Sequence, residues 1–323
     1  MSRRRPSRFN GLLPVFKKAG PTSHDVVDMA RKALGERRIG HTGTLDPLAE
    51  GLLLLCVGQA TRLQQFLLKW DKRYLGEVRL GHATTTYDGE GEAVDPRGEP
   101  PALDEVTISR LTKRFRGEIQ QVPPPYSAKK VQGKKLYELA RNGEEVNLEP
   151  KVVRVEELAI RAIAPNVLAV DATTSTGFYV RSLAHDIGVE LGCGGFLEYL
   201  HRASIGPYSA ADAFTQDALV NAKTPDDVIG SPAWVPIETI ALPFAAIDLN
   251  ATAADRFVHG QDVVFFSPEL TGVENGASVV VRGADRGLLG IGTVRAVLAR
   301  GRTLNVAPEM VLGSFDGGRP RRK

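Results

Sequence analysis

The spacing of apolar residues predicts helices and strands in turn along the first third of the chain. Residues 23–35 place apolar side chains three and four positions apart, as on one buried helix face, with Ser23 expected as N-cap and Gly35 as C-cap. Residues 72–81 alternate apolar and polar positions, as a half-buried strand does. The run LLLLCVG at 52–58 is apolar throughout, so a buried strand and a short buried helix both remain open.

The middle of the chain changes character at a proline-rich segment. Residues 82–94 are interpreted as a polar turn that returns into another strand, and residues 103–116 are predicted to form a helix. Residues 120–146 include three consecutive prolines, which exclude regular structure there. The rest of that stretch is basic and is expected to form a short helix that ends at Gly143. We interpret the whole stretch as an inserted loop.

The second half of the chain is expected to end in an all-β module. Strands are predicted at 151–163 and 166–176, a helix follows within 176–192, and 194–209 is expected to hold a short second helix and a strand. Four prolines within 223–246 indicate a linker. Beyond this linker, short apolar segments between glycine turns predict a compact β module of roughly 70 residues.

Composition and cysteine usage are those of an ordinary globular protein, with 42% hydrophobic and 24% charged residues among 323. No apolar run approaches the roughly 18 residues that a membrane helix needs, and the basic N-terminus lacks the apolar region of a secretory signal. Cys56 and Cys193 provide neither a disulfide framework nor a zinc site. We therefore expect a cytoplasmic protein that does not associate with membranes.

Positive charge is clustered, although the net charge is only +3. Arginine and lysine crowd both ends of the chain. A third basic group lies in the inserted loop at Lys129, Lys130, Lys134, Lys135 and Arg141. Clustered cations favour a phosphate-rich partner because binding releases counterions. For the two ends alone, solubility tails are the more economical interpretation.

A single carboxylate, Asp46, stands between a glycine-rich loop and the apolar run in GHTGTLDPLAEGLLLL (40–55). An Asp-Pro pair most often only makes a turn. The surrounding polar residues His41, Thr42 and Thr44, held by a rigid apolar segment, favour a functional role. A lone carboxylate cannot perform the paired acid/base chemistry of glycosidases, but it can be a nucleophile when a nearby cation keeps it ionised. The histidines show no ligand spacing and no Cys-x-x-Cys pair exists, so no metal is predicted. Phosphate-loop motifs are also absent, which argues against nucleotide-dependent chemistry.

Five segments, in order, resemble the TruB family of tRNA pseudouridine synthases, which act on the uridine at position 55 of the T loop. GHTGTLDPLAEGLLLLCVGQATR (40–62) resembles the family's catalytic motif. KKAGPTSHDVV resembles its N-terminal motif, and DKRYLGEVRLG resembles its tyrosine strand. PPPYSAKKVQGKKLYELAR resembles its RNA-binding insertion, and STGFYVRSLAHDIGVELG resembles its arginine motif. Together they cover about residues 11–210. Lys18 departs from the family, which usually has proline there.

The resemblance implies an α+β pseudouridine synthase fold. Its mixed, mainly antiparallel central sheet would be flanked by helices, and a small C-terminal β-barrel-like domain of the PUA type would follow. The expected division is a basic tail at 1–9, a catalytic domain at 10–240 with an RNA-binding insertion at about 120–148, a PUA-like RNA-binding domain at 245–315, and a basic tail at 316–323.

The resemblance also implies that uridine is isomerised to pseudouridine by base flipping, without a cofactor. Asp46 would be the nucleophile, and Arg181 would pair with it and keep it charged. Tyr74 would be a catalytic residue that stacks on the flipped uracil, a contact worth roughly 1–3 kcal/mol, and could take part in proton transfer. His41 would fill the vacated stack or hold the rearranged loop, and the uracil pocket would be shaped by Tyr179 and Leu200.

The partner implied is the T-arm stem-loop of tRNA, bound by a monomer without an obligatory protein partner. The RNA backbone would be contacted by Lys17, Lys129, Lys130, Lys134 and Lys135, which position the RNA without reading its bases.

Other interpretations remain open at this point. Without the resemblance, Tyr74 and Leu200 would be taken as core residues and Arg181 as a surface ion pair. A related synthase could act on another RNA or need a guide RNA, and a tRNA-folding chaperone that binds the T arm could dispense with Asp46. A phosphatase would need a second aspartate and a magnesium site, which the residues after Asp46 do not offer. The intact Leu-Asp-Pro loop favours the enzyme.

Overall fold

The computed structural model describes residues 7–126, 130–131, 134–135, 149–266, 272–284, 287–298, 303–312, 315–316 and 319–320. The strands of its main sheet are β1 (Gly11–Lys17), β2 (Ile39–His41), β3 (Glu50–Val57), β4 (Lys72–Leu80), β7 (Gly117–Gln121), β10 (Lys151–Ala164), β11 (Val167–Thr174), β12 (Gly195–Ile205), β13 (Tyr208–Ser209), β14 (Phe214–Thr215) and β15 (Val235–Pro236). The helices around it are α1 (Ser23–Leu34), α2 (Gln64–Leu67), α3 (Glu105–Phe115), α5 (Val180–Glu190), α6 (Gln216–Asn221) and α7 (Asp226–Ile229). Short 3₁₀ segments occupy Gly58–Arg62, Ala210–Asp212 and Ile237–Thr239.

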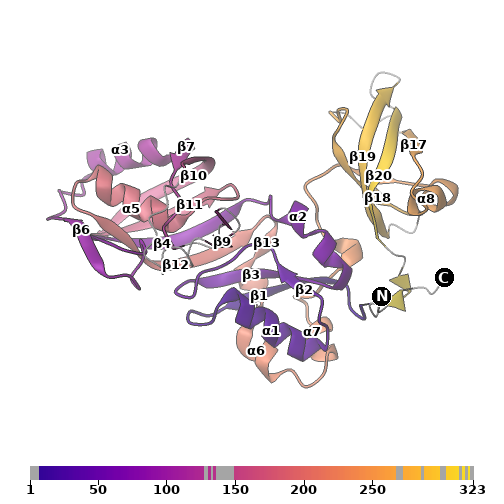
Figure 1. The fold of residues 1–323 in the computed structure, drawn as a ribbon, viewed down its shortest axis with the longest axis horizontal. Helices are drawn as coiled ribbons and strands as arrows, with labels where there is room; N and C mark the ends of the chain where they lie inside the picture. Colours follow the sequence, from indigo (N-terminus) through magenta and orange to yellow (C-terminus); the bar gives the residue numbers. More distant parts are fainter. Residues whose placement is uncertain are drawn as a thin grey trace.

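The main sheet is mixed and mainly antiparallel, as expected. Its order is β14-β1-β3-β12-β4-β11-β10-β7, with β15, β2 and β13 paired beside β1, β3 and β12 (Figure 1). Only the pairs β1 with β14 and β3 with β12 run parallel within this described sheet. The parallel pairing of β3 with β12 is the point where the sequence-distant halves of the sheet join, so it brings the loop before β3 to residues of β12.

The apolar run that the sequence left ambiguous is strand β3, at the centre of the sheet. Its side chains alternate between two cores: Leu53, Leu55 and Val57 belong to the core cluster that also contains side chains of α1, α3 and α5, whereas Leu52, Leu54 and Cys56 belong to the core on the opposite face. A strand buried on both faces has no polar side to alternate with. This double burial explains why the run shows no periodicity.

The N-cap of helix α1 lies one residue earlier than predicted. Thr22, not Ser23, is the N-cap: its hydroxyl accepts a hydrogen bond from the Asp25 amide, and the Asp25 carboxylate accepts one from the Thr22 amide. Gly35 ends the helix in the left-handed conformation at φ 60°, as predicted. Ser23 is therefore a buried helical residue whose hydroxyl is available to a neighbouring segment.

Two expected elements of the first domain are wrong. The short helix predicted within 194–209 is absent from the described structure there: those residues form strand β12 and the short strand β13. The proline-rich segment 223–246 is not a free linker over most of its length, because Val228 packs in the core beneath α1, and Ile237 and Ile240 pack in the core on the other face. Of the short basic helix expected at 131–143, the described residues 131, 134 and 135 are strand instead, and the other residues lie outside the described ranges.

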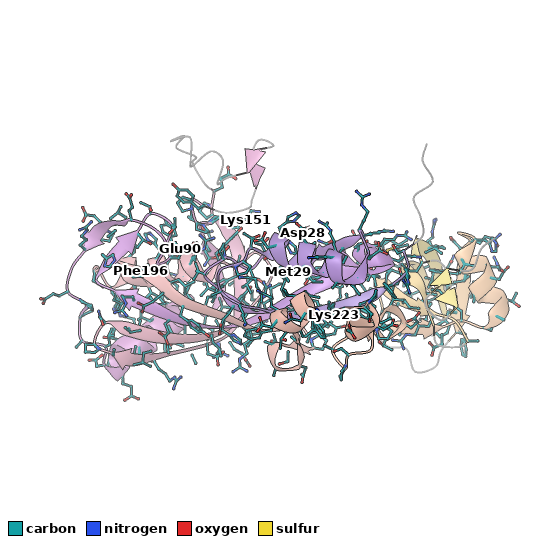
Figure 2. All side chains as sticks on the ribbon, turned by 90° about the horizontal axis from the view of Figure 1, so that it is seen from below. Asp28, Met29, Glu90, Lys151, Phe196 and Lys223 are labelled. Carbon is teal, nitrogen blue, oxygen red and sulfur yellow. The ribbon has the colours of Figure 1, made fainter. Side chains whose placement is uncertain are left out.

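The C-terminal module is a separate sheet of five strands that curls into a half-barrel (Figure 1). Its strands are β16 (Ala246–Asp248), β17 (Val263–Phe266), β18 (Ser278–Arg282), β19 (Leu288–Leu298) and β20 (Thr303–Val311), in the order β16-β18-β19-β20-β17, with α8 (Ala251–Val258) beside them. Side chains of β18, β19 and β20 also join the core that holds Leu52 and Leu54 of β3. The module therefore continues the long axis of the molecule (Figure 2).

The remaining described strands form three short hairpins. These are β5 (His82–Thr84) with β6 (Ala93–Arg97), β8 (Lys130–Val131) with β9 (Lys134–Lys135), and β21 (Phe315–Asp316) with β22 (Arg319–Pro320). The turn between β5 and β6 lies against β12 and α5, and its Asp88 pairs with Arg181 of α5.

Candidate active site

Asp46 lies in the loop between β2 and β3, and helix α1 holds this loop from one side. The Ser23 hydroxyl donates a hydrogen bond to the Leu45 carbonyl at 2.9 Å and accepts one from the Leu45 amide at 2.8 Å. The Ala49 amide then donates to the Asp46 carbonyl at 3.1 Å, which closes the Asp-Pro turn. The backbone on either side of the carboxylate is therefore fixed by a buried serine and by its own turn.

Arg202 of β12 holds the same loop from the opposite side, and the sequence did not single it out. It is 1% exposed, and its guanidinium donates to the carbonyls of Leu52 at 2.7 Å, Thr44 at 3.1 Å and Gly43 at 3.1 Å. A planar group with five donors can bond several carbonyls in one plane, which a lysine cannot do. Arg202 thereby ties the loop to the two strands that meet in parallel at this place.

Lys17, expected to contact the RNA backbone, is instead buried beneath the loop. Its side chain is 0% exposed, and its ammonium group donates to the carbonyls of Lys18 at 3.0 Å, Pro21 at 2.8 Å and Pro47 at 3.3 Å. Burial lowers the pKa of Lys17 to about 8, although Asp46 acts in the opposite direction. The amine binds backbone carbonyls of the chain itself, so it is not available to a phosphate at the surface.

Arg181, at the start of α5, lies between two carboxylates. Its Nε is 2.8 Å from Oδ2 of Asp46, and its Nη1 is 3.3 Å from Oδ2 of Asp88. The guanidinium also donates to the carbonyls of Thr86 at 3.2 Å and Tyr126 at 3.0 Å. Arg181 is 6% exposed, whereas the Asp46 side chain is 32% exposed. The arginine is thus a buried hub, and the carboxylate that it orients remains accessible.

Asp88 is a second residue of the candidate site, after Arg202, that sequence reasoning missed. It lies in the segment interpreted as a polar turn, yet its side chain is 4% exposed. Its Oδ1 accepts hydrogen bonds from the Thr86 hydroxyl and from the Glu90 amide. A buried carboxylate needs a cation and hydrogen-bond donors, and Arg181 supplies the cation. The only signal in the sequence is an aspartate within a Thr- and Gly-rich turn, which is typical of many surface turns.

The Asp46–Arg181 ion pair lies in the wall of a cavity of about 270 Å³, and this cavity gathers most of the residues expected at the site. Asp46, Tyr74, Tyr179, Arg181 and Leu200 all line it. Tyr74 of β4 is paired in register with Arg202 of β12, so the ring lies beside the residue that holds the loop. Both Tyr74 and Leu200 are more than nine-tenths buried, so only a small part of each faces the open space.

Tyr179 is positioned through its backbone. The side chain of Gln121 accepts a hydrogen bond from the Tyr179 amide at 2.8 Å and donates one to its carbonyl at 3.1 Å. This paired contact fixes the residue that caps α5, and Arg181 lies within the first turn of that helix. The start of α5 is therefore held by the end of β7.

Positive charge dominates the cavity wall. Lys72 lines the cavity with Arg181 and Arg202, against the single carboxylate of Asp46. Burial lowers the pKa of Lys72 to about 8, and its amine donates to the carbonyls of Leu68 and Trp70. A wall with this balance favours a ligand rich in electronegative oxygens, such as a nucleotide.

His41 and the lysines of the insertion are placed differently from the residues above. His41 ends β2, is half-buried and does not line the cavity; its Nδ1 accepts a hydrogen bond from the Gly43 amide at 3.3 Å. Burial lowers its pKa, so the ring is neutral at pH 7. Lys129 lies outside the described residues, and so do the side chains of Lys130, Lys134 and Lys135, whose backbone forms β8 and β9.

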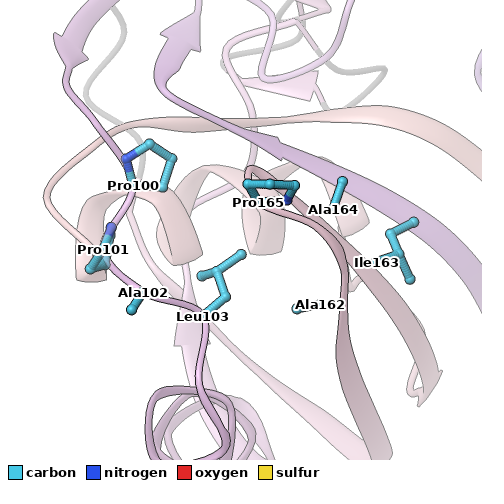
Figure 3. Close-up of a pocket in the computed structure, with 8 residues that line it drawn as sticks. All are labelled: Pro100, Pro101, Ala102, Leu103, Ala162, Ile163, Ala164 and Pro165. Atoms are coloured by element: carbon cyan, nitrogen blue, oxygen red, sulfur yellow. The ribbon is translucent and has the colours of Figure 1, made fainter.

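A second hollow, of about 530 Å³, carries no comparable chemistry. It lies between the segment before α3 and the turn from β10 to β11, and it is lined by Pro, Ala, Leu and Ile alone, none of which titrates (Figure 3). Within the described ranges, no three His, Cys, Asp or Glu side chains are placed to share a metal ion. No helix of the described chain is long and apolar enough to span a bilayer.

Comparison with known proteins points to one family. Residues 31–180 match the TruB family pseudouridylate synthase (N terminal domain), and residues 181–231 match the tRNA pseudouridylate synthase B C-terminal domain. The boundary between the two matches falls at Arg181. Asp46, Tyr74 and Asp88 thus lie in the first matched region, and Leu200 and Arg202 in the second.

Curated relatives and a solved structure agree with this match. The tRNA pseudouridine synthase B of Burkholderia lata is 42% identical over 284 residues, which cover 88% of this chain and 86% of the relative. That of Caldanaerobacter subterraneus is 40% identical over 253 residues, 78% of this chain and 85% of the relative. A chain of an H/ACA RNP bound to a substrate RNA containing 2′-deoxyuridine shares the fold, with a TM-score of 0.71 at 23% identity, over 97% of this chain and 87% of that one. The chain therefore belongs to the TruB family and is a pseudouridine synthase.

Proposed function

We propose that this enzyme isomerises the uridine at position 55 in the T loop of tRNA, with Asp46 as the nucleophile. The observation that carries the proposal is the accessible Asp46 carboxylate, oriented by the buried Arg181 in the wall of a cavity lined by an aromatic ring. The relatives named above are tRNA pseudouridine synthases, which supports tRNA as the substrate.

The reaction requires one carboxylate and no net oxidation or reduction. The bond between N1 of uracil and C1′ of the ribose breaks, a bond between C5 and C1′ forms, C5 loses its proton and N1 gains one. Because the detached base stays in the pocket and is reattached after it rotates, a second carboxylate for a water nucleophile is unnecessary. Asp46 serves this chemistry from its fixed turn, since its backbone is held by Ser23 and Arg202.

The target base reaches the cavity by flipping out of the T loop. Extrusion from a stacked loop costs a few kcal/mol. Stacking on an aromatic ring stabilises a bound base by roughly 1–3 kcal/mol, and Tyr74 provides such a ring in the cavity wall. The cavity is near the lower end of the ~300–1,000 Å³ usual for ligand pockets, which suits one nucleoside. His41, neutral and at the start of the same loop, would fill the gap that the base leaves.

The position of modification is tested with a T-arm hairpin that carries tritium at C5 of its uridines. Tritium leaves C5 only when the new carbon–carbon bond forms there. We expect the purified protein alone to release tritium from the hairpin, and to release none when the uridine at position 55 is replaced by cytidine. Equal release from both hairpins, or conversion of tRNA only after another protein or a guide RNA is added, would overturn the proposed target.

Substituting the lysines of the insertion is expected to change RNA binding, whereas substituting Lys17 is expected to change the stability of the fold. Replacing Lys129, Lys130, Lys134 and Lys135 by glutamine should weaken hairpin binding and make its salt dependence shallower, by about 0.7–0.9 in log–log slope for each phosphate that is no longer neutralised. Lys17→Met should leave that slope unchanged and lower the free energy of unfolding by about 1–3 kcal/mol, since three carbonyls lose their donor. Binding titrations at several salt concentrations and denaturant unfolding measure both. An unchanged slope in the quadruple variant would refute the phosphate contacts.

A further inference from the structure

The turn that presents Asp88 contains an unusual backbone conformation. Tyr87 is the only residue other than glycine with a positive φ in the described chain, at 63°. An L-residue with a bulky side chain adopts this region only when its surroundings stabilise it. The reversal at Tyr87 lies between Thr86, whose carbonyl accepts from Arg181, and Asp88, whose carboxylate pairs with Arg181. The strained residue thus sits between two contacts to the same guanidinium.

The Tyr87 ring is stacked on His185 of α5. The two ring centroids are 3.8 Å apart, and the planes differ by 7°. The backbone of the turn is also bound to β12, because the Leu197 amide donates to the Tyr87 carbonyl and the Gly89 amide donates to the Leu197 carbonyl, each at 3.0 Å. Glu90 of the turn and Phe196 of β12 lie at the same end of the molecule in Figure 2. The turn is therefore enclosed by β12 and α5.

Arg181 and His185 are one helical turn apart on α5. Residues four positions apart lie on the same face of a helix, one above the other. Arg181 contacts Asp46 and Asp88 from this face of α5, and His185 contacts Tyr87 from the same face. One helix face docks the turn at two points, through a charged pair at Asp88 and a ring pair at Tyr87.

His185 serves as a flat platform in this arrangement. Its Nδ1 is buried and has no hydrogen-bond partner among the described residues. Burial lowers the pKa of His185 and raises that of Tyr87, so both rings are neutral at pH 7. The stack is consequently a contact of two uncharged aromatic surfaces, which fixes a position and adds no charge next to Arg181.

We propose that the Tyr87–His185 stack is a positioning device for catalysis: it holds the turn so that Asp88 meets Arg181, and Arg181 in turn orients Asp46. Tyr87 and His185 act through these partners and do not touch the reacting atoms. The inference rests on the proposed role of Asp46, and it requires only that the enzyme forms pseudouridine in some RNA.

Two substitutions at Tyr87 separate the ring from the backbone conformation. Glycine adopts a positive φ without strain but has no ring, whereas phenylalanine keeps the ring and the strain. If the stack positions Asp88, Tyr87→Gly should lower the single-turnover rate of tritium release by about tenfold to a hundredfold, the loss expected from a misplaced catalytic group. Tyr87→Phe should stay within about twofold of wild type, and His185→Ala should resemble Tyr87→Gly.

The route through Asp88 is tested by combining variants. In an Asp88→Asn background, Tyr87→Gly should cause no further loss of rate, because the partner that it positions is already gone. In Tyr87→Gly, RNA affinity should be unchanged and the protein should still be folded at the assay temperature, although loss of the stacked ring lowers its unfolding midpoint. The rates are compared on any RNA that wild type converts, so failure at position 55 of tRNA would not affect this test.

Four outcomes would overturn the inference. They are a Tyr87→Gly enzyme as fast as wild type, an equal loss in both backgrounds, an Asp88→Asn enzyme as fast as wild type, and a loss that appears in RNA affinity alone. The last result would instead mark the exposed part of this turn as an RNA contact.

Discussion

Asp46→Asn is expected to lower the rate of pseudouridine formation by at least about 10⁴-fold, the scale observed when a catalytic unit loses an essential member. Asparagine has nearly the same shape as aspartate, so the turn that Ser23 and Arg202 hold should persist. It lacks the negative charge that attacks, and it cannot form the ion pair with Arg181. RNA affinity should change little, because the amide still fills the same place in the wall.

The measurement is single-turnover tritium release, with RNA affinity and thermal unfolding recorded for the same preparation. Asp217→Asn is the matched control: Asp217 forms an exposed ion pair with Lys18, away from the cavity, so losing it should leave the rate unchanged. A rate for Asp46→Asn above about one hundredth of wild type would displace Asp46 as nucleophile while leaving the enzyme class intact.

Arg181→Met is expected to harm both the rate and the fold. Without the guanidinium, Asp88 keeps a buried carboxylate with no cation beside it, and two backbone carbonyls lose a donor. Removing one partner of a buried pair costs about 3–5 kcal/mol of unfolding free energy, and we expect the lower end because Asp46 remains partly solvated. The rate should fall by about a hundredfold or more, since Asp46 is no longer oriented.

A second substitution separates the two effects. Arg181→Met combined with Asp88→Asn removes the uncompensated charge, so it should recover part of the lost stability but none of the lost rate. Denaturant unfolding and tritium release measure the two quantities independently. If the double variant were no more stable than Arg181→Met, Asp88 would not depend on Arg181 for its charge compensation.

Much of the fold could be predicted from the sequence, because in most elements the spacing of apolar residues is that of a helix or of a strand. The helix at 23–35 and the strand at 72–81 have this property. Strand β12 does not, because a bulge between Leu197 and Tyr199 turns Leu197 and Leu200 toward the same core. Apolar residues three positions apart are the signature of a helix, and the extra residue of a bulge reproduces that spacing within a strand.

The sequence by itself determined the family, the order of its motifs and the candidate nucleophile, because a motif is a string of neighbouring residues and needs no fold to be recognised. It also named Tyr74, Tyr179, Arg181 and Leu200, which the fold brings to one cavity with Asp46.

Only the tertiary structure decided which other charges are buried and what they contact. Asp88 looks like any turn aspartate, and Lys17 like any surface lysine, until the sheet places the first against Arg181 and buries the second under the Asp-Pro turn. Arg202 likewise gains its role only where β3 and β12 run side by side. Burial and pairing of a charge depend on residues far away in the chain, and local sequence patterns carry no record of those distances.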